Sequence, residues 1–167
     1  MLENIETYFD EFPARWKVAK LLFQRGFQVR DDGKIVSGNI EIPHSQIAKE
    51  VDVGRRAVDE TAETILSVPQ LKRIYANLRQ TYSLEEIARQ ENLGVIVIVP
   101  EDPHEKGILF RVAKEVYEHN LEILQVFAEH PSMSTEPKLT IILEKKCPPT
   151  LIERLQKLEG IRHIILC

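Results

Sequence analysis

The sequence has little of several residue types and patterns, and each scarcity excludes a class of protein. Its two cysteines, Cys147 and Cys167, have no metal-ligand spacing, so we predict two free thiols rather than a structural disulfide. The five histidines are scattered without the spacing of a zinc site, which argues against a bound metal. The longest apolar run, Val95–Val99, has the length of a buried strand and is too short to cross a bilayer.

Motifs of catalysis and of targeting are also missing. There is no Gly-rich phosphate loop, no Gly-x-Ser-x-Gly and no persuasive pair of carboxylates. His104 could do acid–base work, but one histidine in a polar loop is usually a surface residue. The N-terminal segment MLENIETYFDEF has no basic region leading into an apolar one, so no secretory signal is expected. These absences predict a cytoplasmic protein that is neither an enzyme nor a membrane protein and carries no cofactor.

Charge is balanced in one half of the chain and slightly acidic in the other. The 167 residues are 43% hydrophobic and 29% charged, which is typical of one ordinary globular domain or two small ones. Residues 1–80 hold 12 Lys and Arg against 12 Asp and Glu, and residues 81–167 hold 10 against 14. Neither half is basic enough to indicate tight, non-specific binding of nucleic acid.

The first 42 residues predict two helices, a hairpin and a short strand. Apolar residues at helical spacing indicate an amphipathic helix over 2–12, which Pro13 ends. A second helix is expected over 15–25, with Gly26 as its C-terminal stop. Asp-Gly between short alternating runs, over 27–36, is a strong hairpin signal, and a strand is expected over 40–42.

The helical patterns over 45–51 and 55–66, separated by a turn containing Gly54, have the spacing of a helix-turn-helix. The second helix of such a pair enters the major groove, so cations at its start have a physical purpose. Three carboxylates on that helix (Asp59, Glu60 and Glu63) would oppose DNA unless they point elsewhere, and units of this kind also bind proteins. The residues that we predict to contact DNA from these helices are Ser45, Gln46, Lys49, Arg55 and Arg56.

Residues 67–82 are ambiguous. Pro69 blocks continuation of the preceding helix, and 71–75 alternate like a strand. In that strand, Lys72 and Arg73 would act as residues of a wing that touch the phosphate backbone, or only as a solvated edge. Residues 83–86 fit a capping box, so a helix is expected over 84–90.

The second half of the chain predicts a βαββαβ pattern, in which two helices cover one face of an antiparallel sheet. Apolar spacing marks the helix over 107–119, with Asn120 as a left-handed cap. The expected strands are 95–99, 121–128, 138–143 and 161–166, and the second helix starts near Leu151 and ends at Gly160.

The loop between the first strand and the first helix of this pattern has features of a ligand site. Gly107 opens the helix, and free backbone N–H groups at such a start can hold a carboxylate. A nearby carboxylate, such as Asp102 or Glu122, could take an ammonium group. Together they would suit an amino acid. Alternatively, Gly107 only permits close packing of the helix on the sheet.

Residues 95–167 resemble an ACT domain in the strand VIVIV, the loop EDPHEKG, the helix GILFRVAKEVYEHN and the strand LEILQVF. With the helix-turn-helix in front, the whole chain is similar to a family of regulators of amino-acid metabolism. The resemblance implies dimers, or higher homo-oligomers, that pair through their sheets and bind ligands at that interface. The chain departs from the family where Lys106 replaces a proline and Glu122 an asparagine. The ligand-binding residues that the resemblance implies are Asp102, His104, Gly107, Ile108, Glu122 and Gln125.

These patterns predict an α+β protein: a (winged) helix-turn-helix domain over 1–82, a connecting helix or linker over 83–93, and a ferredoxin-like, ACT-like domain over 94–167. The favoured function is an amino-acid-responsive transcriptional regulator that binds double-stranded DNA as a homodimer or higher oligomer. The alternative is a regulatory protein that binds no DNA and docks on a biosynthetic enzyme or another protein. The balanced charge of the first half favours the alternative, and the placement of Arg55 and Arg56 favours the regulator.

Overall fold

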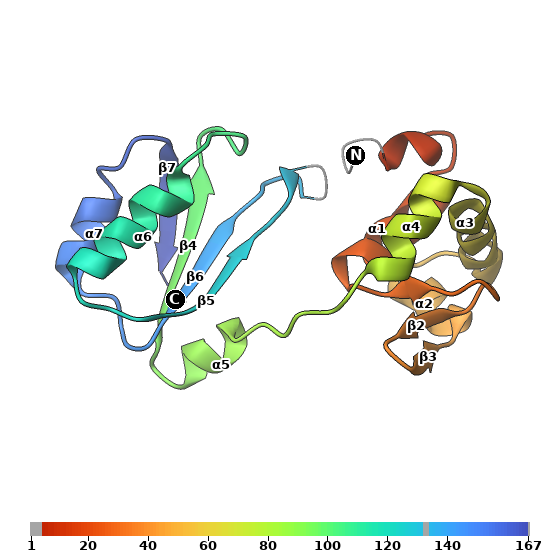
Figure 1. Ribbon diagram of the computed structural model, residues 1–167, viewed down its shortest axis with the longest axis horizontal. Helices are drawn as coiled ribbons and strands as arrows, with labels where there is room; N and C mark the ends of the chain where they lie inside the picture. Colours follow the sequence, from red (N-terminus) through yellow and green to blue (C-terminus); the bar gives the residue numbers. More distant parts are fainter. Residues whose placement is uncertain (1–4, 132–133, 167) are drawn as a thin grey trace. The chain divides into compact units, whose positions relative to one another are not determined.

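The computed structural model describes residues 5–131 and 134–166. The chain divides into two compact units, Met1–Tyr82 and Ser83–Cys167 (Figure 1). The predicted α+β class is confirmed, because the described residues form two antiparallel sheets and seven α-helices. None of these helices is long and apolar enough to span a bilayer.

The first unit is built from helices around a small three-stranded sheet. Its N-terminal segment is not the helix expected over 2–12: the structure has a short 3-10 helix there, and Leu2 lies outside the described residues. Ile5 and Phe9 are buried, whereas Tyr8 and Phe12 remain partly exposed. Its elements are η2 (Glu6–Tyr8), α1 (Pro13–Gln24), β1 (Gln28–Val29), β2 (Ile35–Ser37), β3 (Ile40–Ile42), α2 (His44–Glu50), α3 (Arg55–Ser67) and α4 (Pro69–Asn77).

The hairpin expected from the Asp-Gly turn is confirmed. Strand β1 pairs with β2 and β2 with β3, all antiparallel. At the end of α1, Gly26 adopts a left-handed φ of +64°, and the N–H of Phe27 donates to the carbonyl of Leu22 at 2.8 Å. Gly26 therefore ends α1 as predicted, because a left-handed residue here lets the chain turn back over the last helical turn.

The core of the first unit lies between α1, α3 and α4. Tyr75 of α4 is fully buried, and its hydroxyl donates to the carbonyl of Ala19 at 3.0 Å. Burial raises the pKa of this phenol above its ordinary value. The other buried side chains include Val18, Leu22, Val29, Ile35, Ile47, Val58, Ala62, Ile65 and Leu71.

The segment predicted as a strand or wing at 71–75 is helical, and that prediction is wrong. Pro69 does end α3, but it then serves as the first residue of α4, where its missing N–H is not needed. Leu71 and Tyr75 are both buried at helical spacing, so one face of α4 packs into the core. Because the β-hairpin precedes α2 and a helix follows α3, the described residues contain no wing after α3.

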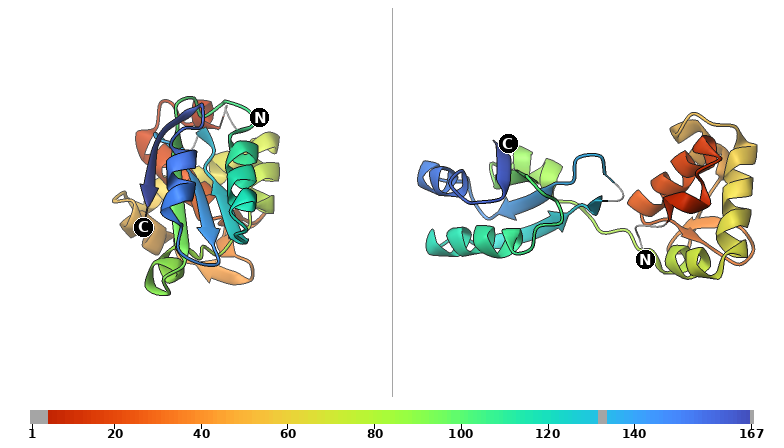
Figure 2. Two further views of the ribbon diagram at one scale, coloured as in Figure 1. Left: turned by 90° about the vertical axis from the view of Figure 1, so that its left-hand side faces the viewer. Right: turned by 90° about the horizontal axis from the view of Figure 1, so that it is seen from above.

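The second unit has the predicted βαββαβ order. Its elements are α5 (Glu85–Gln90), β4 (Gly94–Pro100), α6 (Ile108–Glu118), β5 (Ile123–Ala128), β6 (Leu139–Leu143), α7 (Pro149–Leu155) and β7 (Ile161–Leu166). The sheet has the strand order β5-β6-β4-β7, and every pair is antiparallel. Helices α6 and α7 lie together on one face of the sheet (Figure 2, left). Asn120 adopts the left-handed conformation after α6 that the sequence predicted.

The two faces of this sheet have separate apolar cores. Ile96, Ile98 and Ile141 pack with α6 and α7. Val95 and Val97 pack with Ala88 of α5 on the opposite face. Residues 83–93 are therefore not only a connection, since α5 buries Ala88 against the sheet and belongs to the second unit. Helix α5 begins at Glu85, one residue later than predicted, and the expected capping box does not form, because the residue before the helix is Leu84, which has no side-chain cap hydrogen bond. The Ser83 hydroxyl instead accepts from the N–H of Glu85 at 3.3 Å.

Candidate functional site

The turn between α2 and α3 displays the predicted DNA-contacting residues on the surface of the first unit. Helix α2 ends at Glu50 and α3 begins at Arg55, so four residues join them. The apolar faces of both helices are buried through Ile47 and Val58. Packing therefore turns the polar faces outward, and the side chains left exposed include Ser45, Gln46, Lys49, Arg55 and Arg56.

Arg56 lies in a small ionic network at the start of α3. Its Nε donates to Glu60 at 2.8 Å, and Arg15 of α1 donates to the other oxygen of the same carboxylate at 2.5 and 3.0 Å. The hydrogen bond from Arg56, followed by the one from Arg15, lowers the pKa of Glu60. The Arg56 side chain is 90% exposed and that of Glu60 only 26%. Arg56 thus extends into solvent, while Glu60 is held from the side by α1.

The first arginine of α3 has a weaker acidic partner. Arg55 Nε lies 3.8 Å from Asp59, whose other oxygen is 2.6 Å from Nδ1 of His44. His44 begins α2, so this contact ties the starts of the two helices together. Two of the three carboxylates that opposed DNA binding in the sequence are therefore engaged by side chains of the same unit. Glu63, the third, is exposed.

Lys72 and Arg73 do not extend this surface in the way the sequence predicted. Both are exposed on α4, not on a wing. Lys72 Nζ lies 2.8 Å from Asp31 in the hairpin turn, so it joins α4 to the hairpin. Their assignment as wing contacts to phosphate is wrong because the segment that carries them is a helix.

The loop between β4 and α6 has the local geometry expected of a helix start. Gly107 is the residue before α6 and has a φ of +90°, a conformation that L side chains rarely adopt. Asp102 accepts a hydrogen bond from the N–H of His104 at 2.9 Å. The Asp102 carboxylate therefore shapes its own loop, as Asx turns do.

A cavity of about 190 Å³ lies beside this loop. Gly107 and Ile108 line it, whereas the predicted Asp102 and His104 are exposed outside it. Its volume is below the ~300–1,000 Å³ of typical small-molecule pockets. Its remaining walls come from the loop and from the ends of β5 and β6, and they are formed by Pro100, Pro103, Glu105, Leu109, Ala128, Glu129, Pro137, Lys138 and Leu139.

Glu122 and Gln125 are not brought to this loop within one chain. Glu122 lies at the other end of the sheet, where its carbonyl accepts from the N–H of Glu144 at 3.1 Å. Strand β4 separates that end from the loop by seven residues, or about 20 Å. Gln125 pairs with Ile142 on the face that α5 covers, and its Oε1 accepts from the N–H of Leu84 at 2.9 Å.

Sequence reasoning missed an ion pair that fixes the loop. Glu105 pairs with Arg111, one turn into α6. The Glu105 carboxylate also occupies the space beside Gly160, where a Cβ atom would clash with its Oε2. Gly160 was predicted only as the end of a helix. Its left-handed φ of +81° was predictable from the sequence, but its close approach to Glu105 was not, because two distant loops must meet.

Comparisons with known proteins give no family for the chain. No protein-family model and no curated protein matches it. An AsnC-family transcriptional regulator from Agrobacterium tumefaciens is similar with a TM-score of 0.28 and 14% identity, over 93% of this chain and 87% of that one. A regulator of the AsnC family from Pyrococcus furiosus gives 0.29 and 13%, over 93% and 86%. A CheA P2 domain from Thermotoga maritima, solved with CheY, gives 0.37 and 12%, over 46% and 95%. TM-scores this low assign neither a fold nor a function.

Proposed function

We propose that this protein is a DNA-binding transcriptional regulator whose second unit senses an amino acid. The observation that carries the proposal is the exposed start of α3, where Arg55 and Arg56 extend into solvent from the second helix of a helix-turn-helix. Residues at this position of such helices reach base edges and phosphates. The proposal has no catalytic step.

The network around Glu60 supports this assignment. Moving Arg56 onto a phosphate would leave Glu60 paired with Arg15, which donates two hydrogen bonds to it. Glu60 would not become an unpaired carboxylate close to DNA. The exchange of Arg56 between a carboxylate and a phosphate therefore costs little free energy, since both groups are anionic acceptors that suit a guanidinium.

The proposed effector site is the cavity beside the β4–α6 loop. The backbone N–H groups at the start of α6 favour a carboxylate, and Gly107 keeps a side chain out of the way. The cavity is small in one chain, so we propose that a second copy completes it when the sheets of two chains pair. Glu122 and Gln125 would then contribute from the partner copy.

A second candidate function is a regulatory protein that binds another protein instead of DNA. The observation that favours it is the balance of charge in residues 1–80, together with the exposed Glu63 on α3. A surface of mixed charge gives less general attraction to DNA than a basic one.

The deciding experiment is selection of duplexes by the full chain from a random double-stranded DNA library. Affinity for the enriched duplex is then measured by fluorescence anisotropy for Arg55→Ala, Arg56→Ala and the control Arg73→Ala, which removes an exposed arginine of α4. We expect losses of about tenfold or more for the first two and less than about twofold for the control. If no sequence is enriched, the protein-binding candidate replaces the regulator. Equal losses for all three variants would contradict the assignment of the DNA contact to the start of α3.

A further inference from the structure

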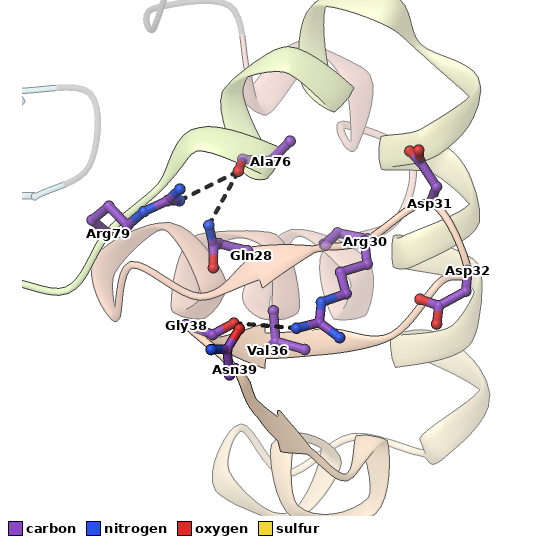
Figure 3. A pocket seen from close by; sticks show the side chains of 10 residues that line it. Gln28, Arg30, Asp31, Asp32, Val36, Gly38, Asn39, Ala76 and Arg79 are labelled. Atoms are coloured by element: carbon purple, nitrogen blue, oxygen red, sulfur yellow. Dashed lines mark hydrogen bonds between the residues drawn. The ribbon is translucent and has the colours of Figure 1, made fainter.

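Another cavity, separate from the one beside the β4–α6 loop, lies in the first unit, and the proposed function does not use it. It has a volume of about 640 Å³, within the ~300–1,000 Å³ range of small-molecule sites. It lies between the β1–β2 hairpin, the β2–β3 turn and the end of α4 (Figure 3). The ten residues that line it are Gln28, Val29, Arg30, Asp31, Asp32, Val36, Gly38, Asn39, Ala76 and Arg79.

The floor of this cavity has a buried polar side chain. Gln28 is only 8% exposed, and its Nε2 donates to the carbonyl of Ala76 at 3.1 Å. With the amide anchored in this way, its Oε1 points away from Ala76 into the cavity (Figure 3). Val36, paired with Gln28 across the hairpin, projects from the same face of the sheet. The floor therefore offers one hydrogen-bond acceptor beside an apolar surface.

Two arginines lie at the cavity without an acidic partner. Arg30 donates to the carbonyl of Gly38 at 3.4 Å, and Arg79 donates to those of Leu78 and Ala76 at 2.6 and 3.4 Å. Neither guanidinium forms an ion pair with any residue that the structure describes. Because a guanidinium has five N–H donors, most of the donors on each remain available to a ligand.

The two acidic residues of the cavity are engaged in the hairpin turn. Asp31 pairs with Lys72 at 2.8 Å, and Asp32 accepts from the backbone N–H of Lys34 at 3.1 Å. Figure 3 places both aspartates at the end of the cavity away from Arg79. The positive charge of Arg79 is therefore not neutralised by the carboxylates that share its cavity.

The backbone that carries Arg79 passes close to Gly26 at the end of α1. A Cβ atom on Gly26 would lie 2.5 Å from the carbonyl carbon of Arg79. The absence of a side chain at Gly26 allows residues 79 and 80 to lie this close to it, within the first unit. The Arg79 guanidinium is oriented by its hydrogen bonds to the carbonyls of Leu78 and Ala76.

We infer that this cavity binds a small anion that carries a carboxylate or phosphate group next to a hydrogen-bond donor. The anionic group pairs with Arg30 and Arg79, which are suited to carboxylates and phosphates through their planar fork of donors. The adjacent donor reaches Oε1 of Gln28. An ammonium beside a carboxylate, as in a free amino acid, meets this requirement, and so does a hydroxyl beside a phosphate.

The test is a titration of the ¹⁵N-labelled full chain in which binding is measured from changes of amide chemical shifts in ¹H–¹⁵N spectra. The probes are inorganic phosphate and each of the twenty amino acids, added singly. We expect at least one probe to shift the amides of 28–32, 36–39 and 76–79 saturably. Saturation by an amino acid but not by phosphate identifies a carboxylate, and the reverse identifies a phosphate.

The titration is repeated with two variants. The first is the double variant Arg30→Gln/Arg79→Gln, and the second is the control Arg73→Gln on α4. We expect the double variant to raise the Kd by about tenfold or more and the control to leave it within about twofold, because charge-assisted bonds contribute most of the affinity. Unchanged spectra elsewhere establish that the double variant is folded. The inference is overturned if no probe shifts these amides, or if the shifts persist in the double variant.

Three further outcomes separate this inference from the proposed function. Shifts confined to 100–109 would support the effector cavity of the second unit and overturn a ligand at Arg30 and Arg79. Shifts at 28–39 and 76–79 that arise only with duplex DNA would assign these arginines to the DNA backbone, and they also overturn the inference. A saturable probe at this cavity together with no enriched duplex would uphold the inference while the regulator fails.

Discussion

The two units of this protein stabilise themselves by different means. In the first unit the strands are only two or three residues long, and helices packed around Tyr75 provide the core. In the second unit the seven-residue strand β4 is buried on both faces. The first unit therefore depends on side chains packed between several short elements, and the second on apolar burial spread along one strand. The candidate site residues of both units lie at the surface, at the start of α3 in the first unit and in the β4–α6 loop in the second.

Removing apolar volume from β4 is expected to have the largest effect. Ile98 is fully buried, so Ile98→Ala should cost the second unit about 2–5 kcal/mol of unfolding free energy. The one tryptophan, Trp16, lies in the first unit and reports that unit alone. In urea, the far-UV transition of the variant should move to lower denaturant while the Trp16 fluorescence transition stays in place.

The exposed Ile40→Ala is the matched control and should move neither transition. An equal shift of the Trp16 transition in Ile98→Ala would show that the two units unfold as one. In that case the contrast between the units would not hold.

Two glycine variants distinguish the effect of the close approach between Gly26 and residues 79–80 from the effect of a left-handed backbone conformation. Gly26→Ala places a Cβ 2.5 Å from backbone atoms in a left-handed residue. We expect a loss of roughly 2–4 kcal/mol, measured by Trp16 fluorescence in urea. Gly33 has a φ of +81° and no atom within 4 Å of such a Cβ. Gly33→Ala should therefore cost only about 1 kcal/mol. Equal losses would mean that the close approach does not matter.

The buried phenol of Tyr75 makes the stability of the first unit depend on pH in the alkaline range. Its pKa is raised in the folded state by burial, from an ordinary value of 10.0. The stability that rests on the neutral phenol is present below pH 10 and is lost as the pH rises above it. Tyr75→Phe removes the hydrogen bond to Ala19 and should cost about 1 kcal/mol near neutrality.

Above pH 10 the Trp16 transition of the wild type should fall faster than that of Tyr75→Phe. Parallel falls would exclude Tyr75 as the cause.

The smallest effect is expected at the ionic network on α3. The pKa of Glu60 is lowered by Arg56 and Arg15, so its contribution is present above its ordinary pKa near 4.5 and is lost as the pH falls through the lowered value. Glu60→Gln should be slightly less stable than the wild type at pH 7, and the difference should shrink below pH 4. Glu63→Gln, an exposed neighbour on the same helix, is the control. A difference that persists at pH 3 would contradict a role for the charge.

Much of the secondary structure was predictable because it rests on local patterns. The turn at Gly33, the stop at Gly26 and the left-handed Asn120 follow from residue type. The apolar run Val95–Val99 predicted a buried strand, and the structure shows that β4 is buried on both faces. Exposure of Arg55 and Arg56 followed from the apolar spacing of α3, since a helix that buries one face must expose the other.

Tertiary structure alone decided the remaining features. The short run 71–75 fits either a strand or a helix, and the packing of Leu71 and Tyr75 against the core selects the helix. A register shift between Ile123 and Gln125 determines which face Gln125 occupies, and a bulge cannot be read from alternation. The cavity at Arg30 and Arg79 joins segments about fifty residues apart, and no local pattern connects them. The sequence determined what depends on neighbours along the chain, and the tertiary structure decided what depends on neighbours in space.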